Sequence, residues 1–179
     1  RLVAVGMNVR NNIVDITNYV MHELGQPLHA FDYDKIKGQH IIVKNLAEGT
    51  KFLSLKKNEQ GENVTLSLNN EDLMICDGEG TGLCVAGVIG SPTSGVSDDT
   101  TTIFLESAHF HPMTTRRSGT RHNTRTDSSK IFEKGSDPNI CAYALKRAAL
   151  LIQALAGGQV SSELIDIYPK PIEKSRIEV

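Results

Sequence analysis

Cysteine is scarce in this chain, and its placement argues against two kinds of stabilised small domain. Only Cys76, Cys84 and Cys141 occur among the 179 residues, an odd number without CxxC spacing. Disulfide frameworks and zinc clusters need paired cysteines at characteristic spacings. We therefore expect three reduced thiols in a cytoplasmic protein, and no metal site built on cysteine.

Long apolar runs and leader segments are also lacking. No hydrophobic run approaches the roughly 20 residues of a membrane-spanning helix, and no basic-then-apolar segment opens the chain. Hydrophobic residues make up 39% and charged residues 22% of the sequence, which is typical of a globular domain. Because Arg1 already lies in structured-looking sequence, we expect residues 1–179 to be a single internal module of a longer protein, without contact to a membrane.

A strong charge of either sign is missing as well. The net charge of −2 and the pI near 6.3 argue against a domain that coats nucleic acid with its whole surface. Residues 116–134 depart from this balance with a local excess of +4. Such a patch suits phosphate binding, although solvated helix faces often look the same. Its basic residues are Arg116, Arg117, Arg121, Arg125, Lys130 and Lys134.

Several familiar catalytic motifs do not occur. There is no GxSxG motif, and the glycine-rich stretch DGEGTG matches neither GxGxxG nor a P-loop. His109 and His111 lie in the pair HFH, but no third ligand follows at a suitable spacing, so we expect no metal there. Nucleophilic serine chemistry, nucleotide binding by these motifs and a histidine metal site are therefore not predicted.

The apolar pattern predicts helices near both ends of the chain and strands between them. Helical spacing over residues 13–24 begins after Asn11 or Asn12 as the cap and ends at Gly25 and Pro27. A short basic helix is predicted within residues 110–121, and a longer one from a cap at Asp137 to Gly157. The fold class is therefore α+β, a layered sandwich of mostly antiparallel or mixed sheet with flanking helices. The predicted strands are residues 40–46, 51–55, 64–68, 73–77, 83–90 and 101–107, with closing strands at 163–169 and 175–179.

Two single residues are candidates for chemistry. His29 follows the first helix end, where a polar side chain can face a cleft, although a lone histidine is more often a packed or surface residue. Glu106 interrupts the apolar strand IFLES. Glutamate is rarely buried unless it is paired, so Glu106 is either solvated at a strand end or held in a pocket.

Four segments together resemble one protein family: VDITNYVMHELGQPLHAFD, AGVIG, LESAHFHP and RTDSSKIFEKGSDP. In order and spacing they are similar to the editing domain of the β subunit of bacterial phenylalanyl-tRNA synthetase. The resemblance extends over essentially the whole chain, although residues 38–72 add little to it. It implies hydrolysis of tyrosine mistakenly esterified to tRNA(Phe), within a synthetase whose ATP and magnesium site lies outside this chain.

The resemblance also implies which residues form the site. His29 corresponds to the editing-site histidine near the ester, and Glu106 to the glutamate that reads the tyrosine hydroxyl. The other implied pocket residues lie on a helix (Thr17 and Asn18), at close backbone approaches (Gly87 and Gly90) and on the opposite wall (Thr126 and Ser128). Family arginines correspond to Arg116, Arg117, Arg121 and Arg125, which either hold tRNA phosphates or brace the fold.

The implied chemistry is physically coherent. An apolar pocket rejects a substrate with an added hydroxyl only by about 10²-fold, whereas a site built around that hydroxyl discriminates by about 10⁴-fold or more. A carboxylate in an apolar pocket provides such a site. With no recognisable nucleophile, we expect attack by a water that His29 orients, without metal or cofactor. The implied partners are the tRNA 3′ end, the rest of the β subunit and the α subunit of a heterotetramer.

The chain departs from the family pattern in three places. Asn8 stands where an arginine is usual, with Arg10 two residues later; Ser128 stands where alanine is common; and Gly90-Ser91 replaces a glycine pair. Two other functions stay open. One is a non-catalytic module that guides tRNA, and the other is an acceptor-stem-binding domain of a different tRNA-modifying enzyme.

Overall fold

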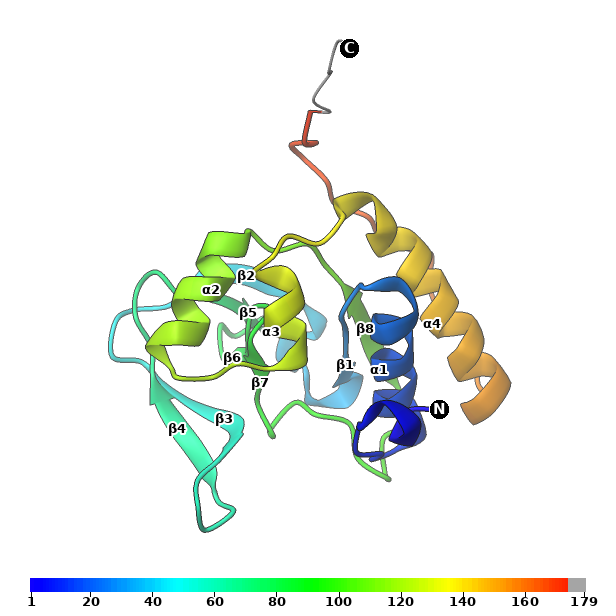
Figure 1. Ribbon diagram of the computed structural model, residues 1–179, viewed down its shortest axis with the longest axis horizontal. Coiled ribbons are helices and arrows are strands. Elements are labelled where there is room, and N and C mark those ends of the chain that lie inside the picture. The colour runs from blue at the N-terminus through cyan, green and yellow to red at the C-terminus, as the bar shows by residue number, and fades with distance from the viewer. Residues whose placement is uncertain (174–179) are drawn as a thin grey trace.

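The computed structural model describes residues 1–173 and has helices at both ends around a block of antiparallel strands (Figure 1). The predicted α+β architecture is therefore confirmed. The elements are α1 Asn12–Leu24, β1 Leu28–Asp32, β2 Ile42–Asn45, β3 Lys51–Lys57, β4 Asn63–Ser67, β5 Leu73–Cys76, β6 Gly82–Val85, β7 Ile89–Gly90, β8 Ile103–Ser107, α2 Pro112–Arg121, α3 Asp127–Phe132 and α4 Cys141–Ala156.

The limits of α1 follow from local chemistry. The Asn11 side chain accepts a hydrogen bond from the Val14 N–H at 2.9 Å, which satisfies one of the free donors at the helix start. Gly25 ends the helix in the left-handed region, at φ 69°, and its N–H donates to the Met21 carbonyl. The chain then turns directly into β1.

The strands form three antiparallel sheets. A four-stranded sheet has the order β2-β5-β6-β7, and β3 pairs with β4 in a hairpin that projects from the body of the molecule. In the third sheet, β1 pairs with β8, and we call this pair the β1–β8 ribbon. It joins residues from the two ends of the strand block and runs beside α1 and α4 (Figure 1).

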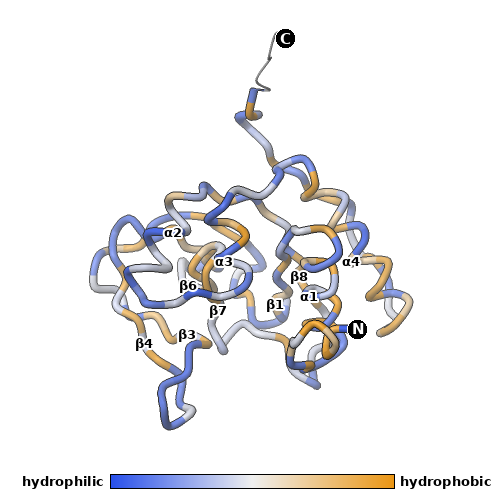
Figure 2. The backbone as a smooth tube through the Cα atoms, in the orientation of Figure 1, coloured by the Kyte–Doolittle hydropathy of each residue, from blue (hydrophilic) through white to orange (hydrophobic). Residues whose placement is uncertain are grey.

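The β1–β8 ribbon separates two hydrophobic cores. On one side, Leu28 and Leu105 pack with Ile16 and Val20 of α1 and with Ala148 of α4. On the other side of the ribbon lies a cluster that includes Phe31, Ile75, Leu83, Phe110 and Phe132. Figure 2 shows hydrophobic stretches of the backbone at β6, β7 and α1. A third cluster, with Phe52, Leu66, Met74, Val85 and Val88, lies beneath the β3–β4 hairpin.

Several predicted elements need correction. Residues 163–169 were predicted as a strand but are exposed and contain none, because no neighbouring strand pairs with them; residues 175–179 lie outside the described part. The last helix begins with a 3-10 turn, Pro138–Ile140, before α4. Its buried face holds Ala144 and Ala148, while Leu155 near its end is 67% exposed. Residues 83–90 form two strands because the chain turns at Gly87.

Candidate functional site

The β1–β8 ribbon brings the two candidate residues together. In its register His29 lies opposite Glu106, and Phe31 lies opposite Phe104. Because side chains alternate between the faces of a strand, these four residues share one face. Phe31 packs against Leu83 and its neighbours on that side, so His29 and Glu106 face β6 and β7 and not the α1–α4 core.

His29 is held in an apolar environment. Its ring lies edge-on to Phe31 with centroids 4.4 Å apart. The Nε2 atom is buried and has no hydrogen-bond partner among the described residues. Burial lowers the pKa of His29 from 6.5 to about 4. The imidazole is therefore neutral at physiological pH, with one ring nitrogen available to a ligand or a water.

Glu106 is perturbed in the opposite direction. Within the described chain its carboxyl group makes no hydrogen bond or ion pair, and burial raises its pKa from 4.5 to about 7. The carboxyl lies near Cys84 of β6. Burial raises the pKa of the Cys84 thiol most, and the charge of the nearby Glu106 raises that pKa further. Two titratable groups with opposite shifts on one strand pair are typical of functional sites.

The two glycines predicted at the site have different surroundings. A Cβ at Gly90 would lie 3.0 Å from His29 Cε1, so only glycine leaves room for the ring in this position. A Cβ at Gly87 would instead lie 2.8 Å from a ring carbon of Phe110, and its φ of +69° also favours glycine. Gly90 therefore lies against His29, and Gly87 lies against the aromatic core behind the turn.

Side-chain contacts attach α3 to the β6–β7 turn and to α1. Thr126 caps α3 and donates through Oγ1 to the Val88 carbonyl at 2.8 Å, which attaches the helix to the β6–β7 turn. Ser128 Oγ contacts Met21 Sδ of α1 at 3.7 Å. One turn earlier on α1, the buried Thr17 hydroxyl donates to the Val14 carbonyl of its own helix, and Asn18 is half-buried.

His29 is half-buried, with its Nε2 atom shielded from solvent. Two cavities, of about 420 and 180 Å³, lie elsewhere in the described chain and are not lined by His29 or Glu106. Leu55 of β3 lies on the same side of Gly90 as the histidine ring, because its Cδ1 lies 3.5 Å from the Cβ position at Gly90. Leu55 itself is 44% exposed.

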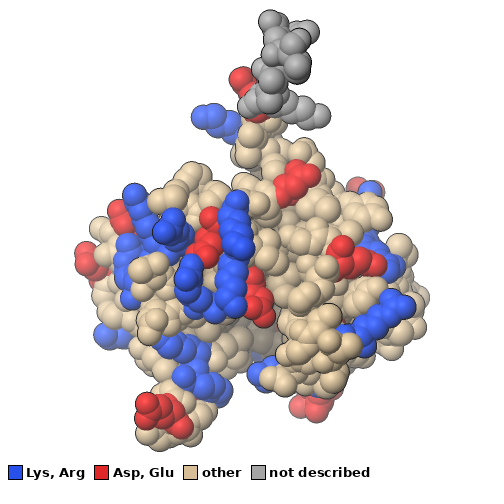
Figure 3. Space-filling view, in the orientation of Figure 1, with Lys and Arg blue, Asp and Glu red and all other residues tan. Residues whose placement is uncertain are grey.

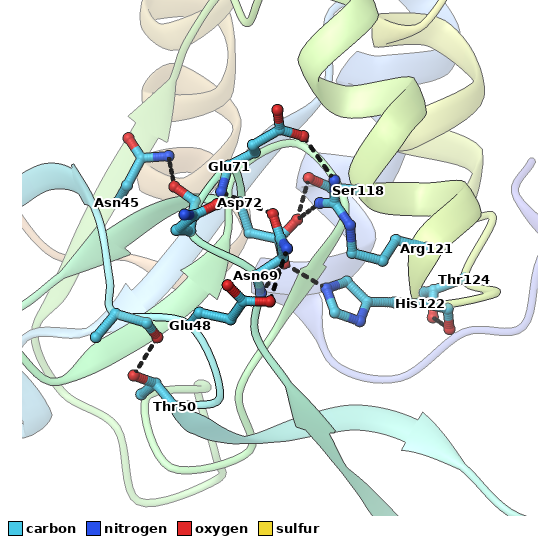
Figure 4. Close-up of polar contacts among 12 residues, drawn as sticks. Asn45, Glu48, Thr50, Asn69, Glu71, Asp72, Ser118, Arg121, His122 and Thr124 are labelled. Atoms are coloured by element: carbon cyan, nitrogen blue, oxygen red, sulfur yellow. Dashed lines mark hydrogen bonds and ion pairs between the residues drawn. The ribbon is translucent and has the colours of Figure 1, made fainter.

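Arg121, a member of the predicted basic patch, stabilises the fold through ion pairs with Asp72 and Glu71. It contacts the buried Asp72 and donates to Glu71 at 2.9 Å (Figure 4). Asp72 also accepts from Ser118 Oγ at 2.7 Å and lies 2.6 Å from His122 Nε2. Burial would raise the pKa of Asp72, but the hydrogen bonds to the carboxylate outweigh it and lower that pKa. This cluster fixes α2 to the β4–β5 connection.

The other arginines divide into two kinds. Arg125 donates to Glu133 at 2.6 Å. Arg116 and Arg117 are exposed on α2 and have no ion pair within the described chain. Figure 3 shows Lys and Arg side chains gathered over α2 and α3 with carboxylates between them. Only part of the predicted patch therefore carries charge that is not already paired.

One of the three departures from the family pattern, Asn8 followed by Arg10, lies at the N-terminal end. Asn8 and Arg10 are both exposed, and in the described residues neither side chain makes a hydrogen bond or ion pair. The Arg10 backbone N–H donates to Asp15 at 2.9 Å.

No group of three metal-ligating side chains occurs in the described part of the chain. None of the described helices is long and apolar enough to cross a membrane.

Some site features were not predicted from the sequence. Residues 28–32 form a strand, although LHAFD was read only as the continuation of a helix end. The signal was available, because Leu28, Ala30 and Asp32 alternate with His29 and Phe31. Helix α3 was also not predicted, although Thr126 followed by Asp127 is a cap signal. Nothing in the sequence pointed to the Asp72 cluster, whose members lie about 50 residues apart.

Comparison with known proteins places these features in a family. Residues 1–157 match the B3/4 domain. The whole chain is 47% identical to part of the phenylalanine–tRNA ligase beta subunit of Bacteroides fragilis and 50% identical to part of that of Porphyromonas gingivalis. It is also 47% identical to part of the corresponding subunit of Bdellovibrio bacteriovorus. In each case the chain spans about a fifth, 21%, of the relative. The chain belongs to the B3/4 domain family.

Proposed function

We propose that this chain is the editing module of a phenylalanine–tRNA ligase beta subunit, and that it hydrolyses the ester of tyrosyl-tRNA(Phe). One observation carries the proposal: the half-buried, neutral His29, whose buried Nε2 has no partner, lies opposite the half-buried, unpaired Glu106 on the β1–β8 ribbon. The names of the relatives support the ligase assignment. The parent enzyme's α subunit and its tRNA are proposed partners on the same ground.

Glu106 is proposed to select tyrosine. A half-buried carboxyl without a hydrogen-bond partner carries a desolvation cost that a ligand hydroxyl relieves. Phenylalanine offers no such donor and would leave the carboxyl unsatisfied. Sites that recognise a hydroxyl in this way discriminate against the analogue without it by about 10⁴-fold. The role proposed for Glu106 is therefore to bind the tyrosine side chain, and not to cleave the ester bond.

His29 is proposed to orient the attacking water. The water oxygen bonds to the ester carbonyl carbon, the bond from that carbon to the ribose oxygen breaks, and a proton ends on the ribose oxygen. A neutral imidazole accepts a hydrogen bond from the water and holds it against the carbonyl. With a pKa of about 4, His29 is a weak base, so positioning and desolvation supply most of the acceleration.

Hydrolysis of tyrosyl- and phenylalanyl-tRNA(Phe) by the chain tests this division of roles. Glu106→Ala should reduce the ratio of kcat/KM for tyrosine over phenylalanine toward one, while hydrolysis of the phenylalanyl ester changes little. His29→Ala should lower kcat for both esters by a similar factor. Equal losses for both esters in both variants would contradict the assignment.

The free arginines favour a second, compatible role in guiding tRNA. Arg116 and Arg117 are exposed and unpaired in the described chain, whereas Arg121 and Arg125 are engaged by carboxylates. We therefore propose that the first two contact phosphates. Each phosphate contact contributes about −0.9 to the slope of log K against log salt. Replacing both by glutamine should make that slope shallower by about 2, and Arg125→Gln should leave it nearly unchanged.

A further inference from the structure

Pro27 creates a defect in the β1–β8 ribbon two residues before His29. Proline has no backbone N–H and leaves a gap wherever a ladder hydrogen bond is due. Such a bond is due at this position. The Tyr33 N–H donates to the Thr102 carbonyl at 3.0 Å, and hydrogen-bonded pairs alternate along an antiparallel ladder. Continued one position beyond Leu28 and Ser107, the same register would place Pro27 opposite Ala108 at a hydrogen-bonded position.

The neighbouring side chain of Gln26 fills this gap. Gln26 is fully buried, and its Nε2 donates to the Ala108 carbonyl at 2.8 Å and to the Pro27 carbonyl at 3.0 Å. The Ala108 carbonyl is the acceptor that the absent N–H of Pro27 would have served. A side-chain amide thus bridges the two strands at the end of the ribbon that leads into His29.

Pro27 reinforces the helix end that Gly25 makes. Gly25 ends α1, and a proline two residues later prevents the helix from continuing into β1. The ribbon must nevertheless keep its register. A slip of one residue would turn His29 away from β6 and β7 and toward the α1–α4 core.

We propose that Gln26 is a positioning residue, whose side-chain amide replaces the ladder hydrogen bond that Pro27 cannot donate and so holds His29 opposite Glu106. Its importance for hydrolysis rests on the editing function proposed above. Its importance for the ribbon does not, because the register is a property of the fold.

The test compares Gln26→Leu with a double variant that also carries Pro27→Ala. Gln26→Leu removes the side-chain donor and puts an apolar side chain of similar volume in its place. Pro27→Ala returns a backbone N–H to the position that faces Ala108. Amide hydrogen exchange at His29, followed by NMR, reports ribbon opening directly. We expect the His29 amide to exchange about tenfold faster in Gln26→Leu than in the wild type. The double variant should regain most of the lost protection.

The matched control is Ser54→Ala. Ser54 is fully buried, and its hydroxyl donates to the Val64 carbonyl at 2.7 Å in the β3–β4 hairpin. The Ser54→Ala variant therefore loses a comparable hydrogen bond from a side chain to the backbone, in another sheet. We expect it to lower global stability without a selective change at the His29 amide. If Gln26→Leu itself does not fold, Gln26→Asn, with an amide one carbon shorter, takes its place.

Enzyme kinetics separates positioning from general destabilisation. Gln26→Leu should lower kcat for the tyrosyl ester more than it raises KM, and the double variant should recover part of the loss. If the double variant stays as impaired as Gln26→Leu, or if Ser54→Ala accelerates exchange at His29 equally, the proposal is wrong. If the wild-type chain hydrolyses no ester, the editing proposal fails, while hydrogen exchange still decides the role of Gln26.

Discussion

Replacement of Glu106 by glutamine should change how the stability of the fold depends on pH. Burial raises the pKa of this carboxyl from 4.5 to about 7. Between these values the folded chain keeps a proton that the unfolded chain has released. The associated stability is fully present below pH 4.5 and is lost as the pH rises through about 7. The difference between the two pKa values corresponds to about 3 kcal/mol of unfolding free energy. Glutamine stays neutral, so the variant does not lose this amount.

His29 contributes with the opposite sign. Its pKa is lowered by burial from 6.5 to about 4, so its stability is present above pH 6.5 and is lost as the pH falls through about 4. In the wild type the two contributions oppose each other between about pH 4.5 and 6.5. Without Glu106 only the histidine effect remains, and stability should rise with pH by about 1.4 kcal/mol per pH unit in the middle of this range.

Urea denaturation between about pH 4 and 8 measures this difference, because the midpoint and slope give the free energy of unfolding at each pH. Relative to the wild type, Glu106→Gln should gain about 3 kcal/mol as the pH rises through this range. The exposed Glu59, replaced by glutamine in the same way, should leave the wild-type profile unchanged. A Glu106→Gln profile parallel to the wild type would refute a buried carboxyl at this position.

Three further substitutions test the surroundings of the site. Leu55→Ala should uncover His29 and return its pKa toward 6.5, which NMR titration of the ring protons measures; an unchanged pKa would mean that other side chains cover it. Gly90→Ala places a Cβ about 3.0 Å from the His29 ring and should cost about 1–3 kcal/mol of unfolding free energy. It should also shift the ring resonances, and unshifted resonances would contradict this contact. Asp72→Ala leaves Arg121 without its buried partner and should lower the free energy of unfolding by about 3–5 kcal/mol. A loss below about 1 kcal/mol would show that the cluster does not anchor α2.

Local sequence signals predicted local structure well. The start and end of α1 followed from Asn11 and Gly25, because capping depends on residues within one turn. The central strands followed from short β-prone runs. The predicted strand at residues 163–169 was wrong because a β-prone run forms a strand only where another strand pairs with it.

The candidate site depends on contacts that no local signal carries. His29 and Glu106 were each noticed singly, but their pairing requires a register between strands 77 residues apart. Gln26 lies between Gly25 and Pro27, which end the predicted helix, and its bond to Ala108 became visible only with the ribbon. The arginines looked alike in the sequence, and their carboxylate partners distinguish them in the fold.

The central claim is that the pocket at His29 and Glu106 recognises tyrosine. The most direct test is an NMR titration of the chain with non-hydrolysable amide analogues of tyrosyl- and phenylalanyl-adenosine, repeated on Glu106→Ala. The account predicts that the tyrosyl analogue binds more tightly, shifts the resonances of His29, and loses its advantage in the variant. If both analogues bind alike, or if the preference survives in Glu106→Ala, Glu106 does not read the tyrosine hydroxyl and the account is contradicted.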